Sequence, residues 1–386
     1  MAKNASSKKV IKKPSHDALP VRHGKAKPKQ LSLRSKNELP PLPVIDWKKL
    51  GGKKPQLLSL GTYKNGNPLP KADVIIITWT SAEWAAFDHV FCDSATPMHH
   101  SSGEGWQKKW VPYSHNYAKL LTPPVTNNNF IKGHSPSLYN KAWGTFCMVK
   151  LGNGKKAILF KSELHISTDG PNIPLITMIE NMVKDSKAGL VLTIGTAGGS
   201  RPADTIGSVN ITNGGHFLLS GQLKEKPFNN KSYSSKWKPK TGLLAKVRKN
   251  LITTPVTMPH LEELAKKMKG GYTLKQLINK TIEPGKIKPL ANVLTEPVLT
   301  TNSFVIGTTS GEYKKYAAME MDDAAIAMTC AELKVNFGVV RNISDPVQNA
   351  KLPYEAQKNW GSTIYSNYGL YTSYNGALCA WAIASA

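Results

Sequence analysis

The sequence predicts an α/β fold with a mainly parallel, mixed central sheet flanked by helices. Two observations support this class. Continuous apolar runs rich in β-branched residues, at 72–77 and 189–194, are typical of strands buried on both faces of a sheet. Helix-like segments such as 173–183 stand between these runs, and an alternation of strands and helices indicates βαβ units.

The first elements are marked by a strand, a helix start and a hairpin. The apolar run at 72–77 leads to Thr80 and Glu83, whose Thr-x-x-Glu spacing is that of a capping box and predicts a helix start. Two further strand-like runs, 144–149 and 156–161, flank a Gly-Asn-Gly sequence and predict a β-hairpin.

The second half of the chain continues the alternation. The strand at 189–194 runs directly into Gly-Thr-Ala-Gly-Gly at 195–199, where glycines let backbone amides approach a ligand closely. Glycines after a strand are equally compatible with a simple tight turn. The remaining elements are expected to be strands at 207–212, 290–304 and 336–340, and helices at 317–333 and 371–386.

The net charge of +26 is concentrated in two segments. Residues 1–55 contain 15 Lys or Arg and 3 Asp or Glu, and residues 222–289 contain 16 and 4, which leaves 20 against 18 for the rest of the chain. The Lys-, Ser- and Pro-rich composition of 1–56 predicts a disordered tail. We therefore expect one domain at 57–386 with insertions at about 93–142 and 222–289.

The basic segments contain almost only lysine. Five arginines occur in the whole chain, at positions 22, 34, 201, 248 and 341. Lysine attracts anions diffusely, whereas arginine recognises phosphate through paired hydrogen bonds. The segments therefore predict either non-specific contact with nucleic acid or another polyanion, or a solubilising tail and a solvated insertion.

The sequence contains no pattern for a metal site, a disulfide framework or a membrane anchor. The four cysteines, Cys92, Cys147, Cys330 and Cys379, have no paired spacing, and the histidines at 99, 100, 115 and 134 match no metal motif. The N-terminus has no apolar signal region, and no apolar run approaches the roughly 20 residues of a membrane span. We expect a cytoplasmic protein with no membrane contact, no metal and no organic cofactor.

The most informative stretch is 319–345. Glu320, Asp322 and Asp323 open a helix-like run, and a short apolar strand then ends in Arg-Asn-Ile-Ser-Asp at 341–345. Acidic groups at a helix start and at the carboxyl end of a strand can converge on one ligand. That arrangement suits a sugar held by carboxylates and a leaving group protonated by an acid.

Four segments in order along the chain resemble the purine nucleoside phosphorylase and nucleosidase superfamily of the nucleoside phosphorylase-I type. The last segment is the most specific, because family members carry a Glu-Met-Glu helix start and an Arg-x-Ile-Ser-Asp strand end at this spacing. The resemblance implies a three-layer phosphorylase-like fold over about 72–386. The segments are 74–83, 193–199 followed by 206–211, 301–307, and 319–327 leading to 340–345.

The resemblance assigns the leaving-group chemistry and the base site. Asp345 matches the family's general acid, which protonates or hydrogen-bonds N7 of the departing purine, and Ser344 would orient it. Phe304 matches the aromatic residue that stacks on the base, and Val305 matches the neighbour whose backbone reads the purine edge. Core packing of Phe304 and a cap formed by Asp345 are the simpler interpretations.

The resemblance also assigns the sugar and water sites. Asp322 stands where the family has glutamate and would accept the ribose hydroxyls, although it is one methylene shorter. Met321 would pack under the ribose, and Glu83 matches the glutamate that activates water in hydrolytic members. Simpler roles are also open: Glu83 could only complete a capping box, and the carboxylates at 320, 322 and 323 could only complement the dipole of the helix that they begin. The same pocket would be lined by Glu320, Ala197 and Gly198.

The nucleophile separates hydrolysis from phosphorolysis. Phosphorylases of the family hold phosphate with arginines, and none occurs at 78–87 or 161–168. Arg341 belongs to the strand motif and is expected to be structural. We therefore expect hydrolysis of the N-glycosidic bond of a purine nucleoside or nucleotide, closest to the hydrolytic nucleosidases. Asp345, where some purine enzymes have asparagine, is compatible with adenine.

Several alternatives stay open. If the substrate is a nucleotide such as AMP or ATP, the expected contacts of its 5′-phosphate are Lys161, His165 and Arg201. Other candidate functions are a phosphorolytic purine nucleoside phosphorylase and a non-catalytic purine-nucleoside-binding module that docks on polyanions. Family members form dimers, trimers or hexamers, so a homo-oligomer is expected.

Overall fold

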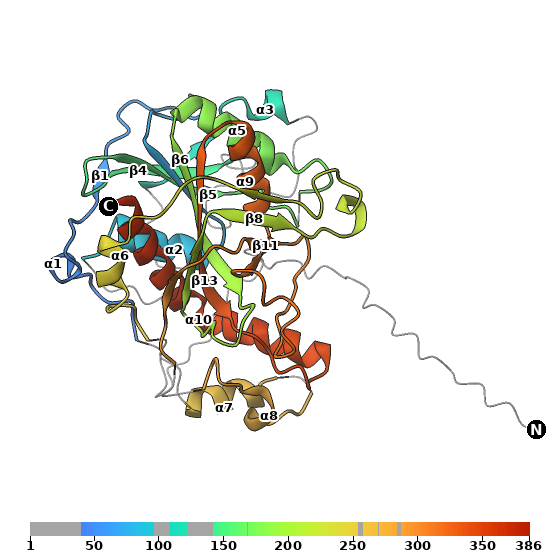
Figure 1. Ribbon diagram of the computed structural model, residues 1–386. Coiled ribbons are helices and arrows are strands. Elements are labelled where there is room, and N and C mark those ends of the chain that lie inside the picture. The colour runs from blue at the N-terminus through green and yellow to red at the C-terminus, as the bar shows by residue number, and fades with distance from the viewer. Residues whose placement is uncertain are drawn as a thin grey trace, which may run out of the picture.

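A mixed β-sheet with helices on both faces forms the centre of the molecule (Figure 1). The computed structural model describes residues 40–95, 109–121, 142–167, 169–253, 258–268, 270–283 and 287–386. Over these residues the sheet has 13 strands. The predicted α/β class is confirmed, with parallel strands at the centre of the sheet and several antiparallel pairs around them.

Four parallel strands determine where the site lies. They are neighbours in the order β5 (Lys156–Ser162), β2 (Val74–Thr78), β6 (Leu190–Gly198) and β13 (Asn336–Asp345). These strands are almost fully buried, which explains the continuous apolar runs in the sequence. Because all four run in the same direction, the residues at their carboxyl ends meet at one edge of the sheet.

The outer strands extend the sheet in three branches. In the first, β4 (Gly144–Lys150) forms the predicted hairpin with β5 and pairs with β1 (Gln56–Leu58) and β3 (Val111–Tyr113). In the second, β13 pairs with β7 (Val209–Thr212), which pairs with β10 (Ala291–Val293). The third leaves β6 through β12 (Met319–Glu320) and continues to β11 (Val298–Thr300), β8 (Gly214–Phe217) and β9 (Ser232–Ser234).

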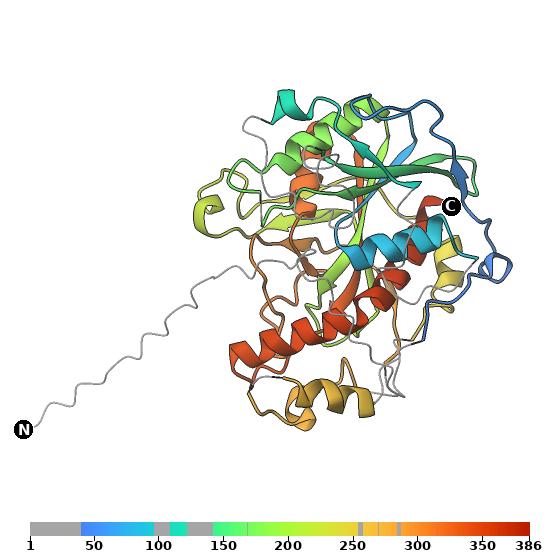
Figure 2. The same ribbon diagram turned by 180° about the vertical axis from the view of Figure 1, so that it is seen from behind.

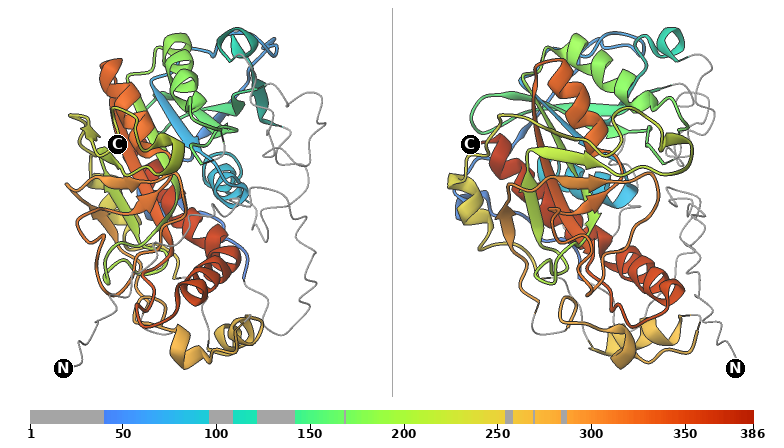
Figure 3. Two further views of the ribbon diagram at one scale, coloured as in Figure 1. Left: turned by 90° about the vertical axis from the view of Figure 1, so that its right-hand side faces the viewer. Right: turned by 45° about the vertical axis from the view of Figure 1, so that its right-hand side comes forward.

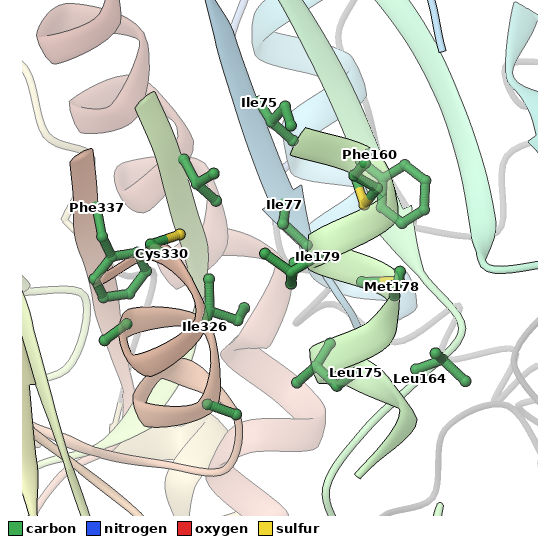
Figure 4. Packing of buried hydrophobic residues seen from close by; sticks show 14 of the residues in the cluster. Ile75, Ile77, Phe160, Leu164, Leu175, Met178, Ile179, Ile326, Cys330 and Phe337 are labelled. Carbon is green, nitrogen blue, oxygen red and sulfur yellow. The ribbon is translucent and has the colours of Figure 1, made fainter. Parts of the chain in front are cut away.

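Helices cover both faces of the sheet and give the three layers that the resemblance implies (Figures 2 and 3). One face carries α5 (Pro174–Ser186) and α9 (Asp323–Glu332), and the other carries α2 (Ser81–Phe91) and α10 (Tyr354–Ala384). Successive strand side chains point to opposite faces. Ile77 of β2 therefore lies in one cluster with Ile179 of α5 and Ile326 of α9 (Figure 4), whereas Val74 and Ile76 belong to the cluster under α2 and α10.

Shorter helices lie at the edges of these layers. They are α1 (Trp47–Leu50), α3 (Tyr117–Leu120), the 3-10 turn η2 (Gly221–Leu223), α6 (Gly242–Val247), α7 (Met258–Lys266) and α8 (Leu274–Leu277). The apolar side chains of α7 and α8 share a cluster with Trp360, Ile364 and Tyr368 of α10. The lysine-rich segment 222–289, predicted as an insertion, is thus partly packed onto the domain.

Folded structure begins earlier than the predicted boundary at residue 57. Leu42, Ile45 and Leu50 are buried in the cluster under α2 and α10, and Asp46 caps α1 through the amide of Lys49. These isolated apolar residues carry no periodicity in a lysine-rich stretch, so the sequence does not reveal their packing. The rest of the predicted tail, residues 1–39, lies outside the described residues, as do the histidines at 99, 100 and 134.

Four predicted element boundaries are wrong, three of them because of pairing between strands. The strand expected at 290–304 is two short strands, β10 and β11, which pair with different neighbours. β6 and β13 pair along their whole length to Gly198 and Asp345, so the glycine-rich sequence after residue 194 is strand and not loop. The helix expected at 317–333 starts only at Asp323, because Met319 pairs with β6. The closing helix starts at Tyr354 and not at 371, because the polar residues of its first half hide the helical pattern.

The four cysteines and one of the predicted loop histidines lie within the described residues. All four cysteines are free thiols, and the Sγ atoms of Cys92 and Cys147 lie 3.7 Å apart. His115 pairs with Asp185 at 2.8 Å near the surface. In the part of the chain that the structure describes, no helix combines the length and the apolar character needed to cross a membrane.

Candidate active site

A cavity of about 640 Å³ lies at the carboxyl ends of β2, β6 and β13. The segment before α9 and the first half of α10 also contribute to its wall. Open α/β sheets place their ligands at this edge. Eleven of the predicted site residues line the cavity: Glu83, His165, Ala197, Gly198, Phe304, Val305, Glu320, Met321, Asp322, Ser344 and Asp345.

Glu83 is held by the backbone around it. With Thr80 it completes the predicted capping box at the start of α2. Its Oε2 also accepts from the Thr78 hydroxyl and the Trp79 amide, and its Oε1 accepts from the amide and the hydroxyl of Thr196 at 2.7 and 2.6 Å. These five donors share the roughly four lone-pair sites of a carboxylate. A water molecule bound in the cavity would therefore contact the Thr196 hydroxyl more readily than Glu83 itself.

Glu320 is also saturated, and one of its partners is a buried arginine. It accepts from the Thr300 hydroxyl, from the amides of Asp322 and Asp323 at 2.6 and 2.9 Å, and from Arg341 Nη2 at 3.1 Å. Arg341 donates to both oxygens of Asp323 at 2.7 and 2.6 Å. Arg341 thus joins β13 to the start of α9 and has the structural role expected from its place in the motif.

Two glycines of β6 make room for the charged groups next to them. A side chain at Gly195 would overlap the guanidinium of Arg341, and one at Gly198 would crowd Asp345. The guanidinium also lies over the ring of Trp79, 5.0 Å from its centroid. The glycine-rich sequence therefore serves close packing of charged groups at the strand end.

Asp322 differs from these saturated carboxylates. Its Oδ1 accepts from the Ile166 amide at 3.0 Å and lies 3.4 Å from Nδ1 of His165. Among the described residues, none donates a hydrogen bond to its Oδ2. Burial and the neighbouring Glu320 raise the pKa of Asp322 well above its usual range. This side chain therefore lines the cavity with one carboxylate oxygen left for a ligand.

Asp345, the last residue of β13, has the same property. Ser344 Oγ donates to its Oδ1 at 2.7 Å, whereas Oδ2 receives no hydrogen bond from the residues that the structure describes. Burial raises the pKa of Asp345 to about 7, and the Ser344 hydroxyl opposes this rise. A carboxyl with this pKa is about half protonated at neutral pH and can donate a proton to a leaving group.

The predicted 5′-phosphate contacts do not form a phosphate site. Lys161 is buried outside the cavity lining and pairs with Glu163 at 2.5 Å. Arg201 also lies outside the lining and pairs with Asp204 at 2.9 Å. His165 does line the cavity, but burial lowers its pKa to about 3, so it is uncharged at neutral pH. The prediction is therefore wrong for Lys161 and Arg201, and His165 does not supply a positive charge.

The apolar part of the lining comes from two segments. Phe304 and Val305 lie in the loop after β11, and Met319 and Met321 lie just before α9. Phe304 is half-buried and lines the cavity, so its ring is accessible to a ligand and is not confined to the core. A flat apolar ligand such as a nucleobase would fit against these side chains.

The sequence reasoning missed several residues of the lining. Trp79, Thr80 and Thr196 are immediate neighbours of motif residues, and attention to those neighbours would have found them. The side chains from α10 were missed because the predicted helix began after them, although their helical spacing of three and four residues could have found them. These are Asn359, Ser362, Tyr365 and Ser366.

The described residues contain no group of three or more His, Cys, Asp or Glu side chains arranged to hold a metal ion. The carboxylates of the cavity are instead engaged by backbone amides, hydroxyls and Arg341. We assign no metal or cofactor role to any of them.

Comparison with known proteins places the chain in a family. The model of the phosphorylase superfamily matches residues 129–363, more than half of the chain, and the chain belongs to this superfamily. A search of curated protein sequences found no match.

Solved structures with a similar fold include a nucleosidase and a hydrolase. One is 5′-methylthioadenosine/S-adenosylhomocysteine nucleosidase from Neisseria meningitidis in complex with methylthio-immucillin-A, with 16% identity over 81% of this chain and 98% of that chain and a TM-score of 0.41. The other is futalosine hydrolase of Helicobacter pylori, with 12% identity over 81% of this chain and 97% of that chain and a TM-score of 0.43. We base the family assignment on the family model alone.

Proposed function

We propose that the protein hydrolyses the N-glycosidic bond of a purine nucleoside, with adenine as the preferred base. One observation carries this proposal. Among four carboxylates that line one cavity, Glu83 and Glu320 are saturated by protein donors, whereas Asp322 and Asp345 each keep an oxygen for a ligand. Asp322 would accept the sugar hydroxyls, and Asp345 would protonate the departing base.

The reaction needs only groups of this chain and one water molecule. As the C1′–N9 bond breaks, its electron pair moves into the purine, and Asp345 delivers a proton to N7. The sugar develops oxocarbenium character, which Asp322 stabilises in its ionised form, although burial and Glu320 raise its pKa. Water then forms the new C1′–O bond and releases one proton.

The water is proposed to lie against hydroxyl groups at the end of β6. Thr196 lines the cavity, and its hydroxyl donates to Glu83 at 2.6 Å. The Thr196 hydroxyl can accept the proton of the water while passing its own to Glu83, which keeps the proton count balanced. Tyr365 of α10 also lines the cavity, and its hydroxyl interacts with Thr196. Glu83 would thus act on water through Thr196.

Electrostatics favours water over phosphate and a nucleoside over a nucleotide. Among the described residues that line the cavity, Arg341 is the one with a permanent positive charge. Its N–H groups donate to Asp323 and Glu320. His165 is uncharged at neutral pH, because burial lowers its pKa to about 3. A phosphate dianion would therefore enter an acidic cavity without a charged partner.

A substrate panel tests this function. The purified chain is incubated with adenosine, methylthioadenosine, AMP and ATP, each with and without phosphate, and free adenine is measured. We expect adenine from the nucleosides at a rate independent of phosphate, and at least about tenfold slower release from AMP and ATP, since an uncompensated buried charge costs well over 1.4 kcal/mol.

The other outcomes separate the competing functions. A strict requirement for phosphate would identify a phosphorylase. Binding of adenine nucleosides without release of base would identify a binding module, and release only from guanine or hypoxanthine nucleosides would contradict the preference for adenine. A homo-oligomer and a cytoplasmic location stay predictions, to be checked by light scattering and by fractionation.

The pH dependence of kcat/KM is expected to follow the protonation of Asp345, and replacement of Ser344 should shift it. Because Asp345 must be protonated to act and its pKa is raised to about 7, kcat/KM should fall as the pH rises through about 7. The Ser344 hydroxyl lowers this pKa, so Ser344→Ala should move the falling limb to higher pH. A pH–rate profile of both proteins measures this. A limb that stayed in place or moved to lower pH would exclude Asp345 as the titrating acid.

A further inference from the structure

Two segments far apart in the sequence form one basic surface on the side of the molecule that carries α1 and α6. α1 and α6 lie side by side (Figure 1). The ammonium group of Lys246 lies against Gly51, which ends α1. We define the α1–α6 basic surface by the exposed cations of both segments. They are Lys48, Lys49, Lys53, Lys54, Lys246, Arg248 and Lys249.

The charge of this surface is not neutralised locally. Asp46 is the one acidic residue in 46–54, and 231–249 contains none. Asp46 is already occupied as the cap of α1. Within the described residues, none of the seven cations forms a salt bridge with a carboxylate. Surface lysines that only solvate a helix are commonly mixed with acids, so this one-sided composition indicates an anionic partner.

The surface rests on a rigid base. Trp47 of α1 packs edge-on against Trp381 of α10 with ring centroids 4.7 Å apart, and Trp47, Trp237 and Leu243 pack against the same core cluster. Leu50 and Leu244 are buried beneath it. The lysines are thus presented by fixed backbone, which lowers the entropy lost when they contact a partner.

The stretch of the chain just before α6 adds positive charge next to the α1–α6 basic surface. In the stretch that leads to α6, exposed lysines at 236, 238 and 240 flank the partly buried Trp237.

The surface is separate from the active site. The cavity is lined by α10 residues up to Ser366, whereas α1 packs on α10 at Trp381. Fifteen residues of helix separate these two positions, or about 22 Å. A partner held there would not enter the cavity, so the surface has no role in binding the nucleoside.

We propose that the α1–α6 basic surface binds the phosphate backbone of nucleic acid without sequence preference. Lysine gives a diffuse, salt-sensitive attraction to phosphates and supplies little geometric readout. A membrane surface is disfavoured, because helices that lie on lipid expose an apolar face, whereas the nearest large exposed apolar residues in sequence, Val44 and Leu57, are single residues outside α1 and α6. This proposal does not depend on the hydrolase activity.

The test measures binding of the full chain to a fluorescein-labelled DNA duplex of mixed sequence at salt concentrations from about 50 to 200 mM. One variant replaces four cations of the surface by glutamine: Lys48, Lys49, Lys246 and Lys249. A control variant makes the same change in charge at four exposed lysines elsewhere: Lys64, Lys184, Lys275 and Lys280.

We expect wild-type binding to weaken steeply with salt, and the slope of log K against log salt to become shallower by about 3 to 4 in the surface variant, since each lost phosphate contact contributes about 0.9. The control variant should keep the wild-type slope, and base release should be the same in all three proteins. Equal slopes in the surface and control variants would overturn the proposal. So would binding to phosphatidylserine vesicles in flotation without binding to DNA.

Discussion

Asp345→Asn is expected to lower kcat for base release by about 100- to 10,000-fold, the range typical of a lost general acid. Asparagine has the shape of aspartate and keeps an oxygen that can accept from Ser344, which donates to Asp345 at 2.7 Å in the structure. What disappears is the proton that a carboxyl with a pKa of about 7 can give to the purine. The affinity for the intact nucleoside should therefore change little.

The measurement combines steady-state kinetics of adenine release with calorimetric titration of the nucleoside. Asp73→Asn is the matched control, because Asp73 is an exposed carboxylate outside the cavity lining and its replacement should leave both values unchanged. Turnover of the Asp345→Asn protein within a factor of about three of wild type would exclude the acid role. Loss of nucleoside binding together with turnover would indicate a structural role.

Sequence patterns predicted the central strands, and the family resemblance predicted about half of the residues that line the cavity. The buried parallel strands leave continuous apolar runs, and the Thr80 and Glu83 capping box is read directly from its spacing. The motif residues Ser344 and Asp345 reach the cavity because they end a parallel strand at the edge where ligands bind. The strands and the capping box depend on local sequence, which is why one chain suffices to predict them, whereas the motif residues were assigned through the family resemblance.

Other features depend on which groups meet in space and were not predictable. Nothing in the sequence shows that Lys161 would pair with Glu163 two residues later and be excluded from the cavity. The contribution of Tyr365 depends on the first half of α10 crossing the ends of the strands. The saturation of Glu83 likewise requires Thr196, which is 113 residues away.

Loss of Arg341 is expected to be the most destabilising single change at the site. Arg341→Gln removes the cation that donates to both oxygens of Asp323 and to Glu320, and all three side chains are buried. Removing one partner from a buried ion pair costs about 3 to 5 kcal/mol, because the remaining charges stay desolvated and unpaired. Urea unfolding should report a decrease of this size in the free energy of unfolding.

Arg201→Gln is the matched control. Asp204 keeps hydrogen bonds from the amide of Ser200 and the side chain of Asn210, and Arg201 is partly exposed, so this change should cost less than about 1 kcal/mol. A similar decrease in the free energy of unfolding in both variants would show that the buried contacts of Arg341 with Asp323 and Glu320 stabilise the fold no more than the partly exposed pair of Arg201.

The pH dependence of the Arg341→Gln protein gives a second, independent test. Arg341 lowers the pKa of Glu320, which burial and Asp323 raise to about 7, so its removal raises the folded-state pKa of Glu320 further. At pH values between the pKa of Glu320 in the unfolded chain and its higher pKa in the folded protein, the folded protein binds more protons. The free energy of unfolding therefore falls as the pH rises through this range. The destabilisation should therefore be smaller at about pH 5 than at about pH 8. A loss of stability that did not depend on pH would mean that the defect comes from packing and not from unpaired carboxylates.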